Sequence, residues 1–350
     1  MRIVVIGATG NAGTSVLAAL SRDDGVESIL GIARRRPGLE VPKVTWLEAD
    51  VVDDPLEPSF RGADVVIHLA WLIQPSRDEA ATRAVNVEGS RRVFDAVARA
   101  GVPALVYASS VGAYAPGPKD RRVAEDWPTT GIPTSFYARH KAEVEQILDR
   151  FEREQPDVRV VRLRPGLIFK RGAASGIRRL FAGPLLPSPL VRRSLVPIVP
   201  KHPRLRFQAI HSLDVGEAYR LAAMREVRGA FNVAADPVLD GEELARLLGA
   251  RALPVRAGAL RAGADLTWRM RLQPTPAGWV DLALSVPLLD TARAREELGF
   301  VPARSSGEAF LELFDGMRER AGMDTPPLAP GTGGPLRVRE LLTGVGAQPR

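Results

Sequence analysis

A buried strand that ends at a glycine-rich turn constrains the fold of this chain more than any other feature. Residues 2–7 read RIVVIG, a continuous apolar run typical of a strand covered on both faces. Gly7, Gly10 and Gly13 follow at intervals of three, and residues 11–22 have helical spacing. In such a turn the first glycine allows the tight bend, the second lets a pyrophosphate approach the backbone, and the third lets the helix pack on the sheet. The segment predicts a dinucleotide site, and a purely structural strand–helix turn is the alternative.

Strands and helices alternate through the N-terminal half of the chain. This alternation predicts an α/β fold with a Rossmann-type, doubly wound parallel sheet. Apolar runs predict further strands, and amphipathic runs predict two long helices, at 81–101 and 135–154. The expected strands cover residues 28–33, 43–50, 63–70, 102–110 and 158–166.

The domain organisation follows from where this alternation ends. We assign residues 1–165 to the nucleotide-binding domain and expect residues 205–235, read as strand, helix and strand, to return to its sheet. Residues 166–322 are expected to form a smaller, mixed substrate-binding region. Within that region, the proline-rich apolar segment 183–203 predicts a lid, and a packing loop is the alternative. The Pro/Gly-rich tail, 323–350, is expected to be disordered.

Composition excludes several function classes. The net charge is +7, but the arginines are spread along the chain and interleaved with acids, so we expect no nucleic-acid partner. No segment has the length and apolarity of a signal peptide or a membrane span, so we expect no stable membrane insertion. There is no cysteine, which suits the cytoplasm. No His, Asp and Glu residues have metal-ligand spacing, so no metal site is predicted.

The segment SFYARHK places Tyr137 and Lys141 four residues apart on an expected helix, so the two side chains share a face. A phenol is a poor acid–base group at neutral pH, and a neighbouring ammonium lowers its pKa by favouring the phenolate. Ser110 ends an expected strand, where ligands bind in such sheets. Ser109 competes with Ser110 for a site role, and Tyr114 competes with Tyr137 but has no lysine one turn later. These residues predict hydride-transfer chemistry at a hydroxyl or carbonyl group.

The glycine spacing and the Tyr-x-x-x-Lys pair together resemble the extended short-chain dehydrogenases/reductases, also called the NAD-dependent epimerase/dehydratase family. The resemblance continues in chain order over about residues 2–320. The matching segments include EAD (48–50), VIHLAW (66–71), NVEGS (86–90), YASSVGAY (107–114) and LRPGLIF (163–169).

This resemblance implies roles for the residues that match. Tyr137 would be the proton donor and acceptor, Lys141 would also hold the nicotinamide ribose, and Ser110 would hydrogen-bond the substrate oxygen; family register favours Ser110 over Ser109. Asn86 could serve the site or close a backbone hydrogen bond, and both readings stay open. The cofactor-binding residues implied are Gly7, Thr9, Gly10, Asn11, Ala12, Gly13, Arg34, Asp50, Val51, Leu69, Ala70, Asn86, Ser109, Tyr137, Lys141, Pro165, Gly166 and Ile168.

The end of the second strand predicts the choice of cofactor. Relatives that use NAD carry an acid there, but this chain has Ala33 followed by Arg34, which could pair with a 2′-phosphate. We therefore predict NADP, with NAD as the alternative; in that case the arginines would form a solvated loop.

The resemblance leaves the substrate open. We expect a small-molecule secondary alcohol or ketone, and a nucleotide-sugar epimerase is the alternative. A non-catalytic NADP-sensing protein is a more distant possibility, because such relatives typically lose the tyrosine or the lysine. A homodimer through helices 81–100 and 135–154 is an expectation from the same resemblance.

Overall fold

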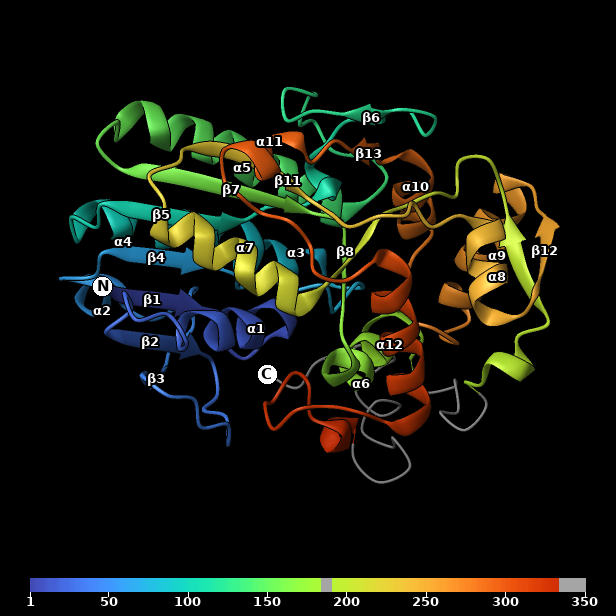
Figure 1. The fold of residues 1–350 in the computed structure, drawn as a ribbon, viewed down its shortest axis with the longest axis horizontal. Coiled ribbons are helices and arrows are strands. Elements are labelled where there is room, and N and C mark those ends of the chain that lie inside the picture. The colour runs from blue at the N-terminus through green and yellow to red at the C-terminus, as the bar shows by residue number, and fades with distance from the viewer. Residues whose placement is uncertain (184–190, 334–350) are drawn as a thin grey trace.

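A computed structural model describes residues 1–183 and 191–333 (Figure 1). Its centre is a seven-stranded sheet with strand order β11-β7-β5-β4-β1-β2-β3, in which every neighbouring pair is parallel. The strands are β1 (Arg2–Ile6), β2 (Ser28–Ala33), β3 (Val44–Glu48), β4 (Val65–His68), β5 (Ala104–Ala108), β7 (Arg159–Pro165) and β11 (Gly229–Val233). The predicted doubly wound parallel sheet is confirmed. Strand order reverses between β1 and β4, and ligands in open α/β sheets bind at such a switch point.

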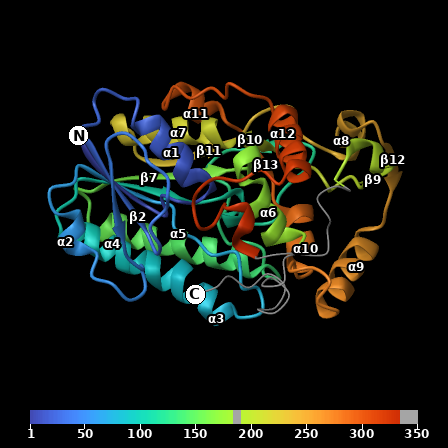
Figure 2. The same ribbon diagram turned by 90° about the horizontal axis from the view of Figure 1, so that it is seen from below.

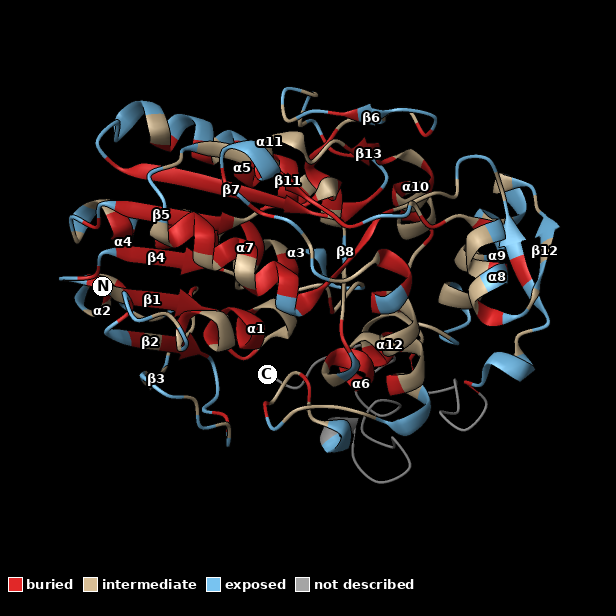
Figure 3. Cartoon of the chain, viewed as in Figure 1, coloured by how far each residue is buried: buried red, intermediate tan, exposed pale blue. Residues whose placement is uncertain are grey.

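Helices cover both faces of this sheet, as Figure 2 shows. On one face lie α1 (Asn11–Leu20) and α7 (Ser212–Met224); on the other lie α2 (Glu57–Phe60), α4 (Gly89–Arg99) and α5 (Phe136–Glu154). Ile3 and Val5 pack in the first core, and Val4 and Ile6 in the second. The continuous apolar run of β1 is explained by this double burial, which is visible in Figure 3. Within the described residues, no helix is long and apolar enough to cross a membrane.

The chain enters α4 through α3 (Glu79–Arg83) and one π-helical turn (Ala84–Glu88). A second, smaller region lies beyond the carboxyl ends of the strands (Figure 1). Its helices are α6 (Ala174–Phe181), α8 (Gly241–Leu248), α9 (Ala257–Arg269), α10 (Gly278–Ser285) and α12 (Ser306–Glu319). In contrast, α11 (Ala292–Glu296) packs beside β11 on the main sheet. Three two-stranded parallel ladders complete the smaller region: β8 (Leu167–Phe169) with β10 (Ala209–His211), β9 (Ile198–Lys201) with β12 (Arg251–Pro254), and β6 (Arg122–Val123) with β13 (Leu288–Leu289).

The return of residues 205–235 to the main sheet occurs only in part. β11 pairs with β7 at the sheet edge, and α7 covers one face. However, β10 pairs with β8 in a separate ladder. The chain turns out of the sheet at Gly166, where a Cβ would lie 2.4 Å from the Gln208 carbonyl oxygen. The Leu167 amide then donates to that oxygen at 3.0 Å, which draws the second segment to β8.

Two expected segments extend past the described residues. Of the predicted lid, residues 184–190 lie outside them, and the following part forms a 3-10 turn (Arg193–Leu195) and β9. Of the predicted tail, residues 334–350 lie outside them. Residues 323–333 differ from the expected disorder, because Thr325 and Leu328 are buried. The segment folds back on α6, where a Cβ on Gly176 would lie only 3.0 Å from the Pro327 carbonyl oxygen.

Candidate nucleotide-binding and catalytic site

The glycine turn has the backbone that its sequence predicts. Gly7 has a φ of +79°, which favours glycine, and its amide donates to the Ile32 carbonyl at 2.9 Å. A Cβ on Gly7 would lie 2.7 Å from the Ala70 amide nitrogen, and one on Gly13 would lie 2.3 Å from the Gly7 carbonyl oxygen. Because α1 begins at Asn11, its first amides face the switch point between β1 and β4, as an anion site requires.

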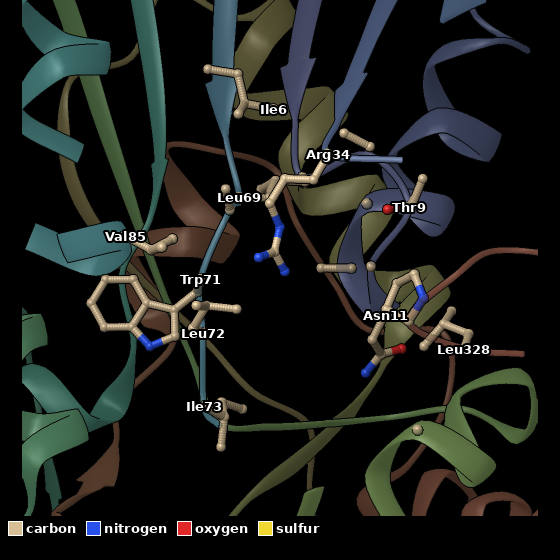
Figure 4. A pocket seen from close by; sticks show the side chains of 18 of the residues that line it. Ile6, Thr9, Asn11, Arg34, Leu69, Trp71, Leu72, Ile73, Val85 and Leu328 are labelled. Carbon is tan, nitrogen blue, oxygen red and sulfur yellow. The ribbon is translucent and has the colours of Figure 1, made fainter. Parts of the chain in front are cut away.

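A cavity of about 260 Å³ opens at this turn (Figure 4). Ten of the predicted cofactor residues line it: Gly7, Thr9, Gly10, Asn11, Ala12, Gly13, Arg34, Val51, Leu69 and Ala70. A second cavity of about 620 Å³ shares Arg34 with the first and is lined by Asp50. Together they form an elongated space along the carboxyl edge of the sheet. The buried Oδ1 of Asn11 has no hydrogen-bond partner in the described part of the chain. The site therefore has both a glycine turn that a ligand can approach closely and a polar atom that is free to bind one. These features fit a dinucleotide.

Arg34 follows β2 and lies at the junction of the two cavities. Its guanidinium extends into the open space in Figure 4. Among residues 1–183 and 191–333, it forms no ion pair closer than 4 Å, and Arg35 lines the second cavity only. The arginine therefore has free donors beside the place where an adenosine ribose would lie.

The three predicted catalytic side chains come together beside the cavities. Ser110 follows β5, and Ser135 caps α5, because its hydroxyl accepts from the Ala138 amide. The cap places Tyr137 in the first turn of α5, beside Ser110: a Cβ on Gly112 would lie 2.8 Å from the Tyr137 ring and 3.4 Å from the Ser110 hydroxyl oxygen. Lys141 lies one turn later, and its Nζ donates to the Ala108 carbonyl at 2.6 Å. This arrangement joins the end of a sheet strand to the first turns of one helix.

Burial controls the protonation of this group. Burial raises the pKa of Tyr137, and the hydrogen bond with Ser110 lowers it. Burial also brings the pKa of Lys141 well below its usual value, and Glu145 counteracts this. From the sequence we expect the Lys141 ammonium to lower the pKa of Tyr137. In the structure, burial has the larger effect and raises that pKa. The Lys141 Nζ lies 6.0 Å from the centre of the Tyr137 ring.

Two tryptophans surround the phenol, and the sequence analysis missed both. The Trp71 ring centre lies 5.9 Å from that of Tyr137, and the Trp279 ring centre lies 5.1 Å from it. Phe181 packs on Trp279 at 5.0 Å. Trp71 lies in the VIHLAW segment and could have been noticed there; α10 and α6 carry no local signal that places Trp279 and Phe181 at the site. The wall around the phenol is aromatic.

The competing residues have other partners. The Ser109 hydroxyl donates to Glu145, so Ser109 points away from Tyr137. The Tyr114 hydroxyl donates to Asn232 at 2.6 Å and accepts from Arg164 at 3.0 Å. These contacts leave Ser110 and Tyr137 as the pair at the site.

The remaining predicted residues, Asn86, Pro165, Gly166 and Ile168, do not line the two cavities. The Asn86 amide group bonds the Leu72 backbone N–H and C=O, which closes the loop after β4. Ile168 accepts from the Asn11 side chain through its carbonyl at 3.0 Å. Pro165 ends β7 and Gly166 joins it to β8, and neither residue lines a cavity described above. The structural reading of Asn86 is thus the one its hydrogen bonds support.

The tail contributes a wall that the sequence did not indicate. Pro327 and Leu328 line the first cavity together with Gly176, Ile177 and Leu180, and Leu328 lies near Asn11 in Figure 4. Leu328 is only 4% exposed. Its neighbourhood is over 300 residues from the turn in sequence, so no local pattern could have paired them.

Comparison with known proteins identifies the family. The family model described as NAD dependent epimerase/dehydratase family matches residues 3–234. The chain belongs to this family. The match spans the whole sheet and includes the glycine turn, Ser110, Tyr137 and Lys141.

The relatives among known proteins are distant in sequence. An uncharacterized protein of Mycobacterium tuberculosis is 28% identical over 326 residues, which is 92% of this chain and 31% of that protein. The chain thus spans about a third of the length of that relative. An L-arabinose 1-dehydrogenase (NAD(P)(+)) of Haloferax volcanii is 30% identical over 176 residues, which is 47% of this chain and 66% of that protein.

Among solved structures, the UDP-glucose 4-epimerase of Thermus thermophilus in complex with NAD superposes with a TM-score of 0.66. It is 22% identical and the alignment covers 91% of this chain and 99% of that chain. At this identity the likeness shows the fold.

Proposed function

We propose that this chain is an NADP-preferring oxidoreductase that transfers a hydride reversibly between the cofactor and a secondary alcohol or ketone. The observation that carries the proposal is that Ser110 and Tyr137 lie side by side around Gly112, with Lys141 one helical turn away, beside a cavity built on the glycine turn. An alcohol and a carbonyl differ by a hydride and a proton, so the site needs one group that moves each.

The chain's own residues would handle the proton. In the reducing direction the Tyr137 hydroxyl gives its proton to the substrate oxygen, which becomes an alcohol, and in the reverse direction the phenolate takes that proton back. The Ser110 hydroxyl donates a hydrogen bond to the same oxygen and orients it. The ammonium of Lys141 stabilises the phenolate left after proton transfer. A bound nicotinamide supplies or accepts the hydride.

The cofactor would lie along the carboxyl edge of the sheet. The first amides of α1 would hold the diphosphate, and Asp50 would face the adenosine end. Arg34 supports NADP over NAD, because a free guanidinium at the end of β2 can pair with a 2′-phosphate. The family and the NAD in the similar epimerase structure support a nicotinamide dinucleotide more generally.

A nucleotide-sugar epimerase is the second candidate, supported by the similarity to the Thermus thermophilus enzyme. An epimerase regenerates its cofactor in each cycle, whereas an oxidoreductase consumes it. The test is therefore the loss of NADPH absorbance with a panel of ketones, and the loss of NADH absorbance as the comparison. Stoichiometric NADPH consumption supports the proposal. Conversion of a UDP-sugar without net NADPH or NADH consumption would assign the epimerase instead. Absence of both reactions would favour a non-catalytic, nucleotide-sensing role.

A further inference from the structure

Lys170 is a buried cation next to the glycine turn. It follows β8 directly and is only 6% exposed. Its Nζ donates to three oxygens of the first turns of α1: the Asn11 carbonyl at 2.9 Å, the Thr14 hydroxyl at 2.6 Å and the Ser15 hydroxyl at 3.1 Å. An ammonium has three protons, so all its donors are used, and all three acceptors are neutral.

No carboxylate neutralises this charge at short range. Across residues 1–183 and 191–333, no acid lies within 4 Å of Lys170 Nζ. Glu312 of α12 is the acid that acts on it electrostatically, and this carboxylate already accepts from the Arg171 amide at 3.0 Å and contacts His211 Nε2 at 3.0 Å.

The other neighbours of Lys170 do not supply a negative charge either. Ser212 of α7 is neutral and bonds Ser15 and the Asn11 carbonyl. The Arg171 guanidinium pairs with Glu319. Lys170 is therefore a desolvated cation with only one engaged acid near it.

This position is electrostatically unfavourable in two ways. A buried charge without a close counter-ion loses hydration that is not replaced. The N-terminal end of a helix also carries positive partial charge, which repels a cation placed within its first turn. The three hydrogen bonds hold Lys170 in place, and an anion at the same end of α1 would compensate its charge.

We propose that Lys170 is a positioning residue for the cofactor diphosphate, and that it supplies the buried positive charge beneath the first turn of α1. The inference rests on the proposed cofactor binding and not on the hydride chemistry. Lys170 Nζ contacts the Asn11 carbonyl oxygen, and the covalent geometry of a residue then places Nζ within about 7 Å of the Asn11 amide nitrogen. Asn11 lines the first cavity, so the Lys170 ammonium acts through Asn11 on an anion bound there.

The protonation of Lys170 should make diphosphate binding depend on pH. Burial lowers the pKa of Lys170 to about 8. A diphosphate next to the ammonium favours the charged form, so binding raises that pKa. Above about pH 8 the free protein must take up a proton to bind, and affinity for a diphosphate falls as pH rises.

The test is binding, measured by displacement of a fluorescent nucleotide between pH 7 and pH 10. ADP is the main probe, because it carries the diphosphate but lacks the nicotinamide ribose expected at Lys141, whose pKa is also shifted. Adenosine 2′-monophosphate is the matched probe without a diphosphate. NADP binding by the wild type is measured alongside, so that failure of the cofactor proposal is recognised separately.

The expected result is that Lys170→Met weakens ADP binding about tenfold at pH 7, leaves adenosine 2′-monophosphate binding unchanged and removes the loss of ADP affinity above pH 8. The control Lys201→Met, on β9 far from the turn, keeps wild-type behaviour. Equal ADP affinity in Lys170→Met, or an unchanged pH profile, overturns the proposal.

Lys170→Arg keeps the test decisive if the methionine variant does not fold. The guanidinium keeps its charge over this pH range. We expect wild-type ADP affinity at pH 7 and no decline towards pH 10. A decline as steep as that of the wild type would assign the titration to another group.

Discussion

The indole ring of Trp71 lies over the ammonium of Lys141, with the Lys141 Nζ 3.4 Å from the ring centre. Trp71 also lines the first cavity, together with the glycine turn (Figure 4), so it links this cavity to the side chain expected to hold the nicotinamide ribose. A cation over the face of tryptophan is stabilised by about 2 kcal/mol when the pair is desolvated. The contact thus favours the charged form of Lys141 and opposes the burial that lowers its pKa.

This contact predicts a fluorescence signal for binding. A dinucleotide that reaches Lys141 must contact or displace the Trp71 ring, so we expect NADP to change the protein's tryptophan emission. The chain has five tryptophans, and Trp71→Phe should remove most of this change. The control is Trp127→Phe, whose ring lines neither cavity and should leave the signal intact. An undiminished signal in Trp71→Phe would place the nucleotide elsewhere.

Removal of the phenol oxygen tests the proton-transfer role. We expect Tyr137→Phe to lower turnover at least about a hundredfold, because the substrate oxygen then has no group to give or take its proton. Binding of NADP, measured by calorimetry, should stay within about threefold of the wild type. Tyr107→Phe is the matched control, since its buried hydroxyl has no hydrogen-bond partner in the described residues. Full activity in Tyr137→Phe would refute the assigned role.

Arg34 is expected to decide between the two cofactors. A hydrogen bond to a charged group contributes about 1.5–3 kcal/mol, so Arg34→Ala should weaken NADP binding by about ten- to a hundredfold and leave NAD binding nearly unchanged. Arg36→Ala is the control, because Arg36 lines neither cavity. Equal losses for NADP and NAD in Arg34→Ala would show that the arginine does not read the 2′-phosphate.

A buried ion network next to the site predicts how the free energy of unfolding changes at acid pH. Glu145 is fully buried and pairs with Arg162 at 2.8 Å and Arg164 at 2.9 Å. Burial raises the pKa of Glu145, but hydrogen bonds and the charge of Arg164 hold it at about 2. The folded-state pKa is therefore below the unfolded value of about 4.3, so the stabilisation is present above pH 4.3 and is lost as pH falls towards 2.

Urea unfolding measures this contribution. Glu145→Ala leaves two buried guanidinium groups without their shared partner and should lower the free energy of unfolding by about 3–5 kcal/mol at pH 7. Asp149→Ala removes a half-exposed acid that also pairs with Arg162, and it should cost no more than about 1 kcal/mol. Similar effects of the two variants would mean that the buried pair contributes little.

Leu328 predicts a role for the tail in cofactor retention. Its side chain forms part of the wall of the first cavity near Asn11, so Leu328→Asp should increase the dissociation rate of NADP about tenfold by admitting water to that wall. Val301→Asp is the control, since Val301 is exposed. Stopped-flow displacement measures both rates. A rate unchanged by Leu328→Asp would show that the tail does not hold the cofactor.

The sequence by itself determined the features that follow local rules. The apolar run and the glycine spacing predicted β1, the turn and α1, because a tight turn and a close helix–sheet contact require glycine at those positions. The Tyr137–Lys141 spacing placed both side chains on one helical face, since residues four apart are neighbours on a helix.

Only the tertiary structure decided which distant residues complete the site. Trp279 against Tyr137, Leu328 in one cavity with Gly10, and β10 beside β8 join segments far apart in the chain. Packing selects such contacts by the shape and the buried area of the side chains. Neither property produces a periodic pattern in the local sequence. Lys170 shows this most directly, because only the fold places its ammonium against three oxygens of α1, which lie about 155 residues away in the chain.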